Sequence, residues 1–279
     1  MNLTTRAPAK LNLCLYVGPL RPDGLHEIRS VFQPITLADE VTMQKGTGGA
    51  DEVVCPGVRG PNLAAAALAA FRNRFGWDGP PVLVTIEKHI PVSAGLGGGS
   101  ADAAAVLRLA AAAAHRRPSH AELADLAMSL GADVPSQLQP RTALVTGAGE
   151  AVEPLPQRKV QGVLLAGRGA LPTARVYERA DELGLARASL DGVDVEHLHN
   201  DLQAAALDLE PEAGRALSLL RAAGATDAQL SGSGPAAFGL FDDANRAAKA
   251  LAGGWRGLTA AFESAPPGYA EVRSISSAT

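Results

Sequence analysis

Residues 91–102 (PVSAGLGGGSAD) combine the residue types best suited to chemistry in this chain of 279 residues. They follow the β-prone residues 82–86 and precede an alanine-rich helical pattern. Glycine lets a backbone approach an anion closely and adopt positive φ, and a helix N-terminus directs unpaired N–H groups at negative charge. Ser100 adds a hydroxyl suited to a phosphate oxygen or Mg²⁺. The pattern predicts a phosphate-binding loop, and a purely structural turn is the alternative.

The loop differs from the two commoner phosphate loops. A Walker A loop requires Gly-Lys-Ser/Thr, and no lysine follows these glycines. A Rossmann turn lies near the start of a repeated βαβ pattern, whereas these glycines begin about a third of the way along the chain. A different class of nucleotide site is therefore indicated.

Alternating strand and helix patterns surround the loop. Strands are predicted at residues 3–17 (interrupted by Pro8), 32–36, 39–44, 82–86 and 142–146, and helices at 61–75, 100–114 and 119–131. Ser119 and Glu122 have the spacing of a capping box, and Gly76 and Gly131 are typical helix ends.

A domain boundary is predicted within residues 148–159, where Gly149, Pro154 and Pro156 cluster, so the expected domains are 1–152 and 153–279. The second half contains predicted strands at 160–166, 228–230, 236–241 and 258–264, and helices at 173–183, before Gly224 and at 244–252. This order approaches the β-α-β-β-α-β plan of ferredoxin-like domains, with an insertion.

Composition narrows the possible partners. A net charge of −4 and a pI near 5.9 argue against a nucleic-acid-binding surface, for which a basic face would be expected. Cys14 and Cys55 are far apart and suggest neither a disulfide framework nor a zinc site. The polar N-terminus has no apolar signal core, and the longest apolar runs are too short for a bilayer, so we expect a cytoplasmic protein without a membrane partner.

Four further segments give the chain a family resemblance when they are taken with the glycine loop. They are APAKLNL with RPDGLH (residues 7–13 and 21–26), GADVP (131–135), NDL (200–202) and SGSGP (231–235). Together they resemble the GHMP small-molecule kinases. The pair at residues 7–13 and 21–26 is similar to the branch that phosphorylates the 2-hydroxyl of a cytidylyl-linked methylerythritol, in the non-mevalonate route to isoprenoid and terpenoid precursors.

The resemblance implies an α+β fold of two domains. The N-terminal domain would be of the ribosomal-protein-S5-like type, the C-terminal domain ferredoxin-like, and the active site would lie in the cleft between them. It implies ATP and Mg²⁺ as cofactors and a cytidylyl compound as substrate. The ATP-binding residues that it implies are Pro91, Val92, Ser93, Ala94, Gly95, Leu96, Gly97, Gly98, Gly99, Ser100, Ala101, Asn62 and Lys88, with Ser100 also near Mg²⁺.

The resemblance also implies a catalytic pair. Lys10 would lie beside the acceptor hydroxyl, where a fixed cation suits phosphoryl transfer. Asp133 would accept the hydroxyl proton or orient the hydroxyl. Without the resemblance, Lys10 would be interpreted as a solvated strand residue, and Asp133 could be a turn-forming aspartate at a helix end.

Substrate-binding residues implied by the resemblance are Asn12, Leu25, His26, Asp133, Tyr177, Gly232, Ser233 and Gly234. His26 would hydrogen-bond the cytosine. Leu25 stands where the family usually has an aromatic residue that stacks on the base, and Tyr177 could cover the other face or be a buried helix residue. Ala101 replaces a frequent second serine, and Asn62 and Lys88 could be a helix cap and a solvated lysine. The rival functions are another GHMP kinase, of the homoserine or mevalonate type, and a non-catalytic nucleotide sensor.

Overall fold

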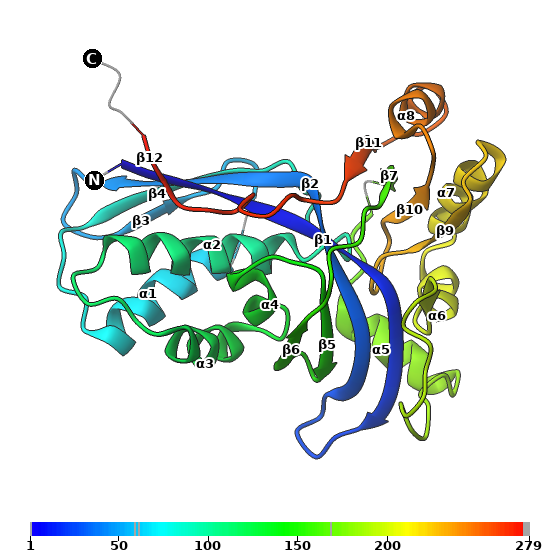
Figure 1. Cartoon of the computed structure of the whole chain (residues 1–279), viewed down its shortest axis with the longest axis horizontal. Coiled ribbons are helices and arrows are strands. Elements are labelled where there is room, and N and C mark those ends of the chain that lie inside the picture. The colour runs from blue at the N-terminus through cyan, green and yellow to red at the C-terminus, as the bar shows by residue number, and fades with distance from the viewer. Residues whose placement is uncertain (1, 59, 61, 168, 276–279) are drawn as a thin grey trace.

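The chain folds around two largely antiparallel sheets. The computed structural model describes residues 2–58, 60, 62–167 and 169–275. Within these residues the strands form an eight-stranded sheet and a four-stranded sheet. Figure 1 shows the larger sheet lying over a layer of helices, and the smaller sheet with its own helices at the other end of the molecule.

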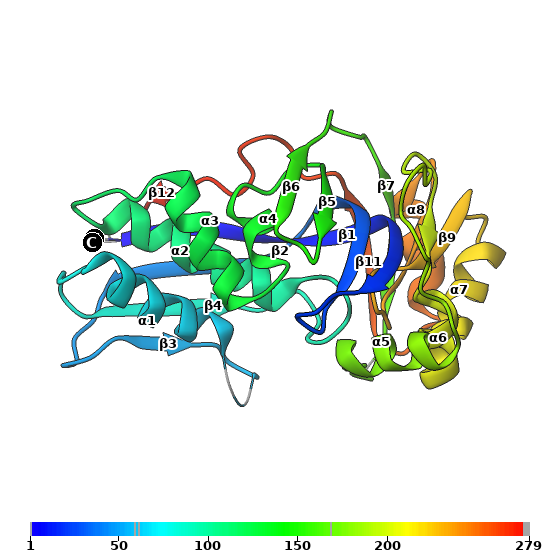
Figure 2. The same cartoon turned by 90° about the horizontal axis from the view of Figure 1, so that it is seen from below.

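The larger sheet has the path β12-β1-β2-β4-β3, and further strands pair with β1, β2 and β5. Its strands are β1 (Asn2–Leu20), β2 (His26–Lys45), β3 (Glu52–Val54), β4 (Val82–Glu87), β5 (Ala143–Gly147), β6 (Ala151–Pro154), β8 (His199–Asn200) and β12 (Arg273–Ser274). Its helices are α1 (Leu63–Phe75), α2 (Gly98–Ala113), α3 (His120–Leu130) and α4 (Val134–Leu138). Figure 2 shows these helices together on one face of the sheet.

The first two strands are longer than the sequence predicts. Pro8 does not end β1, and residues 32–36 and 39–44 belong to one strand, β2. The register of the β1–β2 ladder shifts between Pro8 and Lys10. Because proline has no N–H to donate, such an irregularity lets the ladder continue past it.

Helix ends follow local chemistry closely. The Asn62 side chain caps α1, whose C-cap Gly76 is left-handed, and Ser119 and Glu122 form the predicted capping box of α3. Pro61, the predicted start of the first helix, lies outside the described residues. The prediction for α2 was two residues late, because this helix already begins at Gly98.

The second half has the expected ferredoxin-like arrangement. Its sheet has the order β11-β7-β10-β9, with all described pairs antiparallel. The strands are β7 (Gln161–Ala166), β9 (Asp227–Leu230), β10 (Ala237–Leu240) and β11 (Leu258–Glu263), and the helices are α5 (Thr173–Glu182), α6 (Gln203–Leu209), α7 (Pro211–Ala222) and α8 (Ala244–Ala252). The chain changes sheets between β6 and β7, and β12 returns to pair with β1.

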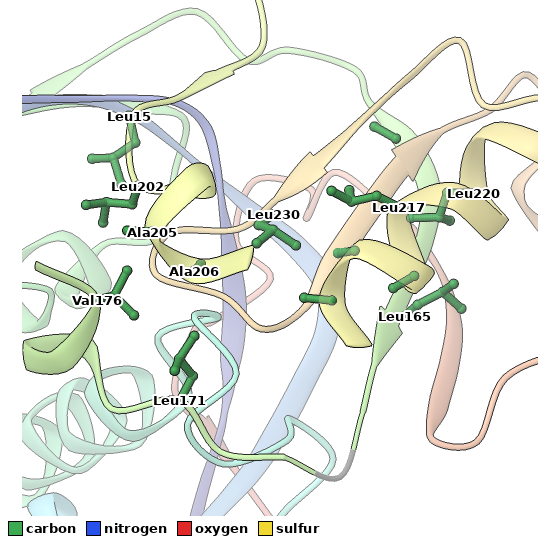
Figure 3. Close-up of a cluster of buried hydrophobic side chains, with 14 of the residues drawn as sticks. Leu15, Leu165, Leu171, Val176, Leu202, Ala205, Ala206, Leu217, Leu220 and Leu230 are labelled. Carbon is green, nitrogen blue, oxygen red and sulfur yellow. The ribbon is translucent and has the colours of Figure 1, made fainter. Parts of the chain in front are cut away.

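Buried apolar clusters join the two halves. Leu15 of β1 and Val145 of β5 belong to the same buried cluster as Leu165 of β7 and Val176 of α5. Figure 3 shows the part of this cluster where the C-terminal helices pack. Close packing of this kind holds the two sheets at a fixed separation. Among the described residues, the helices are too short or too polar to cross a membrane.

Candidate active site

A cavity of about 410 Å³ lies where the two halves meet. Its lining includes most of the residues that the sequence singled out, and these are Lys10, Asn12, Asn62, Lys88, Pro91, Val92, Ser93, Ala94, Gly95, Leu96, Gly97, Gly98, Gly99, Ser100, Asp133, Tyr177, Gly232 and Ser233. Leu25, His26, Ala101 and Gly234 are not in the lining. The fold thus gathers segments that are up to about 220 residues apart in the sequence.

Lys10 occupies the centre of the polar part of this cavity. It is only 5% exposed, and its Nζ donates to Asn12 Oδ1 at 2.7 Å and lies 3.5 Å from Asp133 Oδ2. The same Nζ lies 4.5 Å from the ring centroid of Phe32, a distance typical of cation–π contacts. The solvated strand lysine is therefore the wrong interpretation, because this ammonium is buried and held on three sides.

A chain of hydrogen bonds orients Asn12. Its Nδ2 donates to Ser30 Oγ at 2.8 Å, and Ser30 Oγ donates to the carbonyl of Cys14 at 2.5 Å. This arrangement leaves Asn12 Oδ1 facing Lys10. Sequence reasoning missed Ser30 and Phe32, which lie on one face of β2. Their only signal was the pairing of β2 with β1, which requires the register to be known.

The glycine loop exposes backbone to the cavity. Ser93, Gly95 and Gly97 have positive φ angles, and α2 begins immediately afterwards at Gly98. A Cβ at Gly99 would meet no atom within 4 Å, so the first turn of α2 faces open space there. Unpaired N–H groups at such a helix start attract anions.

Ala101 does not share this exposure. It is fully buried in the apolar core, and its N–H donates to the Gly97 carbonyl at 2.8 Å. The predicted ATP contact at Ala101 is therefore not brought to the cavity, because the helix turns this residue inward.

The loop at residues 231–235 is held against the glycine loop. Ser231 Oγ donates to the Gly95 carbonyl at 3.1 Å, and a Cβ at Gly95 would overlap the carbonyl oxygen of Ser231. Asn200 Nδ2 donates to the carbonyls of Leu230 and Gly232 at 3.0 and 2.9 Å. These bonds place backbone from the C-terminal half at the base of the cavity.

Lys88 is paired with two carboxylates rather than solvated. Its Nζ donates to Asp39 Oδ2 at 2.5 Å and to Asp102 Oδ2 at 2.8 Å. Burial raises the pKa of Asp102 to about 7, against the opposing effect of Lys88. Asp102 Oδ1 is buried without a hydrogen-bond partner among the described residues. Sequence reasoning assigned nothing to Asp102, although it ends the glycine-rich segment.

This raised pKa predicts a pH-dependent stability. A folded-state pKa of about 7 lies above the ordinary 3.8, so the folded protein binds this proton more tightly than the unfolded chain. The contribution of this proton to the free energy of unfolding is fully present below the pKa of Asp102 in the unfolded chain. It is lost as the pH rises through the folded-state pKa of about 7. We expect Asp102→Asn to gain stability relative to the parent as the pH rises from about 4 to about 7, measured by urea unfolding. If the difference in unfolding free energy between the two proteins did not change with pH, the raised pKa of Asp102 would be contradicted.

His26 lies beyond the cavity lining but contacts it through Tyr177. The two rings stack with centroids 5.6 Å apart, and His26 Nδ1 lies 2.9 Å from the Gly18 carbonyl. His26 Nε2 lies 3.1 Å from Asp181 Oδ1. Leu25 is 46% exposed beside it. Asp181 was missed, although it follows Tyr177 by one helical turn on α5 and so shares its face.

Asn62 lines the cavity while its side chain serves as a helix cap. Asn62 Oδ1 accepts from the N–H of Ala64 at 2.9 Å. Its cap function is confirmed, and its contact with a nucleotide base stays a prediction.

Both halves of the chain resemble known proteins. Residues 62–139 match the family described as GHMP kinases N terminal domain, and residues 175–256 match GHMP kinases C terminal. The chain is 42% identical to a 4-diphosphocytidyl-2-C-methyl-D-erythritol kinase of Anaeromyxobacter dehalogenans, over 86% of this chain and 81% of the relative. It is 39% identical to the kinase of the same name from Cutibacterium acnes, over 90% of each chain.

Solved structures show the same relationship. A crystal structure of 4-(cytidine 5'-diphospho)-2C-methyl-D-erythritol kinase has a TM-score of 0.77 and 34% identity, and the match covers 94% of this chain and 100% of that one. A mevalonate kinase from L. major has a TM-score of 0.67 at 15% identity, over 94% and 96% of the two chains. The second likeness concerns the fold alone.

Proposed function

The chain belongs to the GHMP kinase family, and we propose that it transfers the γ-phosphoryl group of ATP to the 2-hydroxyl of 4-diphosphocytidyl-2-C-methyl-D-erythritol. The products would be the 2-phosphate and ADP, in the non-mevalonate supply of isoprenoid precursors. The observation that carries the proposal is the 3.5 Å approach of Lys10 Nζ to Asp133 Oδ2 inside the cavity that the glycine loop lines.

ATP would bind along the glycine loop. The first turn of α2 offers backbone N–H groups and open space at Gly99, which together suit the triphosphate. Lys88 is the nearby cation on the strand side, and its two carboxylates hold it in place. We propose that Asn62 lies at the base end of the nucleotide, because it lines the same cavity.

Mg²⁺ fits the donor set at Ser100. This residue lines the cavity, and its hydroxyl makes no hydrogen bond within the described part of the chain. Mg²⁺ is commonly held by one or two protein oxygens together with substrate phosphates and water. When bound, the ion would neutralise charge on the β- and γ-phosphates.

The acceptor hydroxyl would lie between Lys10 and Asp133. Phosphoryl transfer depends on positioning and on stabilisation of the charge that develops. The buried ammonium of Lys10 supplies fixed positive charge, and the Asp133 carboxylate accepts the hydroxyl proton or orients the hydroxyl. Asn12 and Phe32 keep the ammonium in place.

The cytidylyl group would lie at the His26 end of the cavity. The His26 ring provides polar nitrogen atoms there. Its stacked partner Tyr177 and the exposed Leu25 provide apolar surface for the base. We propose that the Gly18 carbonyl fixes the His26 ring through Nδ1, and that Nε2 exchanges its contact with Asp181 for a hydrogen bond to cytosine. Gly232 and Ser233, which line the cavity, would bring backbone to the diphosphate, and Gly234 follows them outside the lining.

A coupled ADP-release assay tests the function. We expect turnover with the cytidylyl substrate and none above background with homoserine or mevalonate. Equal turnover with either alternative would favour another kinase of the family, and ATP binding without turnover on all three would favour a sensor. We propose that the reaction takes place in the cytoplasm. We also propose that the chain has two domains, residues 1–152 and 153–279.

Replacement of His26 tests cytosine recognition. A site that hydrogen-bonds its substrate rejects analogues that leave its buried polar groups unpaired. We therefore expect His26→Ala to raise KM for the cytidylyl substrate by about tenfold or more and to blunt its preference over a uridylyl analogue. The exposed His197 provides a matched control, His197→Ala, that should leave both constants unchanged. If His26→Ala kept the full preference for the cytidylyl substrate over the uridylyl analogue, His26 would not be the residue that recognises cytosine.

A further inference from the structure

A second cavity, of about 650 Å³, lies away from the reaction cleft. It is formed by α2, α3, the segment after α4 and residues 265–272, and among the described residues it shares no lining residue with the first cavity. In Figure 2 the segment between β11 and β12 passes the region of α3 and α4. The apolar part of the lining includes Ala111, Leu123, Leu138, Leu155, Pro266 and Val272.

Two arginines without acidic partners among the described residues belong to this lining. Arg108 and Arg141 both line the cavity, and within the described chain neither has a carboxylate oxygen within 4.0 Å. Arg108 donates to the carbonyls of Gln137 and Arg6 at 2.6 and 2.7 Å, and its Nε is buried without a partner. These carbonyls satisfy hydrogen bonds but do not neutralise the charge.

Burial without an acidic partner in the described part of the chain disfavours the charged form of Arg108. Burial lowers its pKa to about 10, and no charged neighbour opposes the effect. An anion in the cavity would relieve this cost, because opposite charge favours the ionised form. His120 adds a polar edge to the lining, and Glu271 is its acidic member, exposed near Gly268.

We propose that this cavity is a second ligand site, which binds an amphiphilic anion with a phosphate or carboxylate head group and an aliphatic tail. Arg108 and Arg141 would hold the head group, since guanidinium forks suit both kinds of oxyanion. The leucine, alanine and proline side chains would cover the tail. The site is independent of the phosphoryl-transfer chemistry proposed above.

Titration calorimetry with octyl phosphate tests the site, using the full chain with its cleft saturated by Mg²⁺, a non-hydrolysable ATP analogue and the cytidylyl substrate. We expect octyl phosphate to bind, and octanol and inorganic phosphate each to bind at least tenfold more weakly. Octanoate in place of octyl phosphate shows which head group is preferred. Binding that the ATP analogue abolishes would overturn the proposal.

Variants locate the binding. Arg141 is exposed, so Arg141→Gln should keep the fold and weaken octyl phosphate binding about tenfold. Ala111→Phe should fill the cavity and reduce binding while both arginines remain. Arg256→Gln, an exposed arginine elsewhere, is the matched control and should bind as the parent does. Equal affinity in the parent, Arg141→Gln and Ala111→Phe would overturn the proposal.

Discussion

Asp133→Asn and Lys10→Met should each lower kcat by about 100-fold or more while the Kd for ATP changes little. Loss of a general base or of a fixed charge that stabilises the transition state has this magnitude. Neither side chain belongs to the glycine loop, and Lys10 Nζ lies 3.5 Å from Asp133 Oδ2. Steady-state kinetics and ATP titration on the same samples measure the two effects separately.

Exposed residues of the same types provide controls. Asp125→Asn on α3 and Lys45→Met at the end of β2 remove the same charges far from the cavity and should leave kcat unchanged. Circular dichroism and thermal melting establish that the Lys10→Met protein is folded, since that side chain is buried. Near-normal turnover in both active-site variants would refute the assigned catalytic pair.

The double variant indicates whether the two groups act together. If Lys10 and Asp133 serve one transition state, their effects should be strongly non-additive, because removing either one already disables the shared step. Independent contributions would instead multiply. The double variant also distinguishes a base from an orienting group at Asp133. If Asp133 only orients the hydroxyl, its replacement should still lower kcat to some extent in the Lys10→Met background.

Local chemistry made much of the fold predictable. The capping box at Ser119 and the left-handed Gly76 depend only on neighbouring residues, so the helix ends that they mark are confirmed. The glycine loop was located for the same reason. The continuous β1–β2 ladder was not predicted, because its path past Pro8 depends on a register shift with a partner strand.

The site was predictable where a motif carried it and unpredictable where only topology did. Lys10, Asp133 and the glycine loop lie in recognisable segments and meet in one cavity. Ser30 orients Asn12 across the β1–β2 pairing, and Asp181 meets His26 from 155 residues away. Such contacts have no signal in the order of residues along the chain. Taken alone, Lys88 could be a solvated strand lysine. That interpretation is wrong, because Asp39 and Asp102 pair with it from two separate elements of the fold.

Gly99→Val should abolish tight ATP binding and leave the fold intact. A Cβ at Gly99 meets no protein atom within 4 Å, and its φ angle is not in the left-handed region. Valine would therefore extend into the space where the phosphates are expected, and steric exclusion together with lost charge-assisted hydrogen bonds should weaken ATP binding about 100-fold. Isothermal titration with ATP and Mg²⁺ measures the loss.

Gly99 separates ligand binding from folding better than its neighbour Gly97 does. A Cβ at Gly97 would lie 3.1 Å from Lys10 Cγ on a backbone with φ of +68°, so a valine there would strain the loop and displace the catalytic lysine together. Gly214 in α7 is the matched control, because it also lies near a helix start and its added Cβ would make only ordinary contact with Leu207. Gly214→Val should bind ATP as the parent does. If Gly99→Val also kept parental affinity and melting temperature, the phosphates would not lie at the first turn of α2, and the loop would be a structural turn.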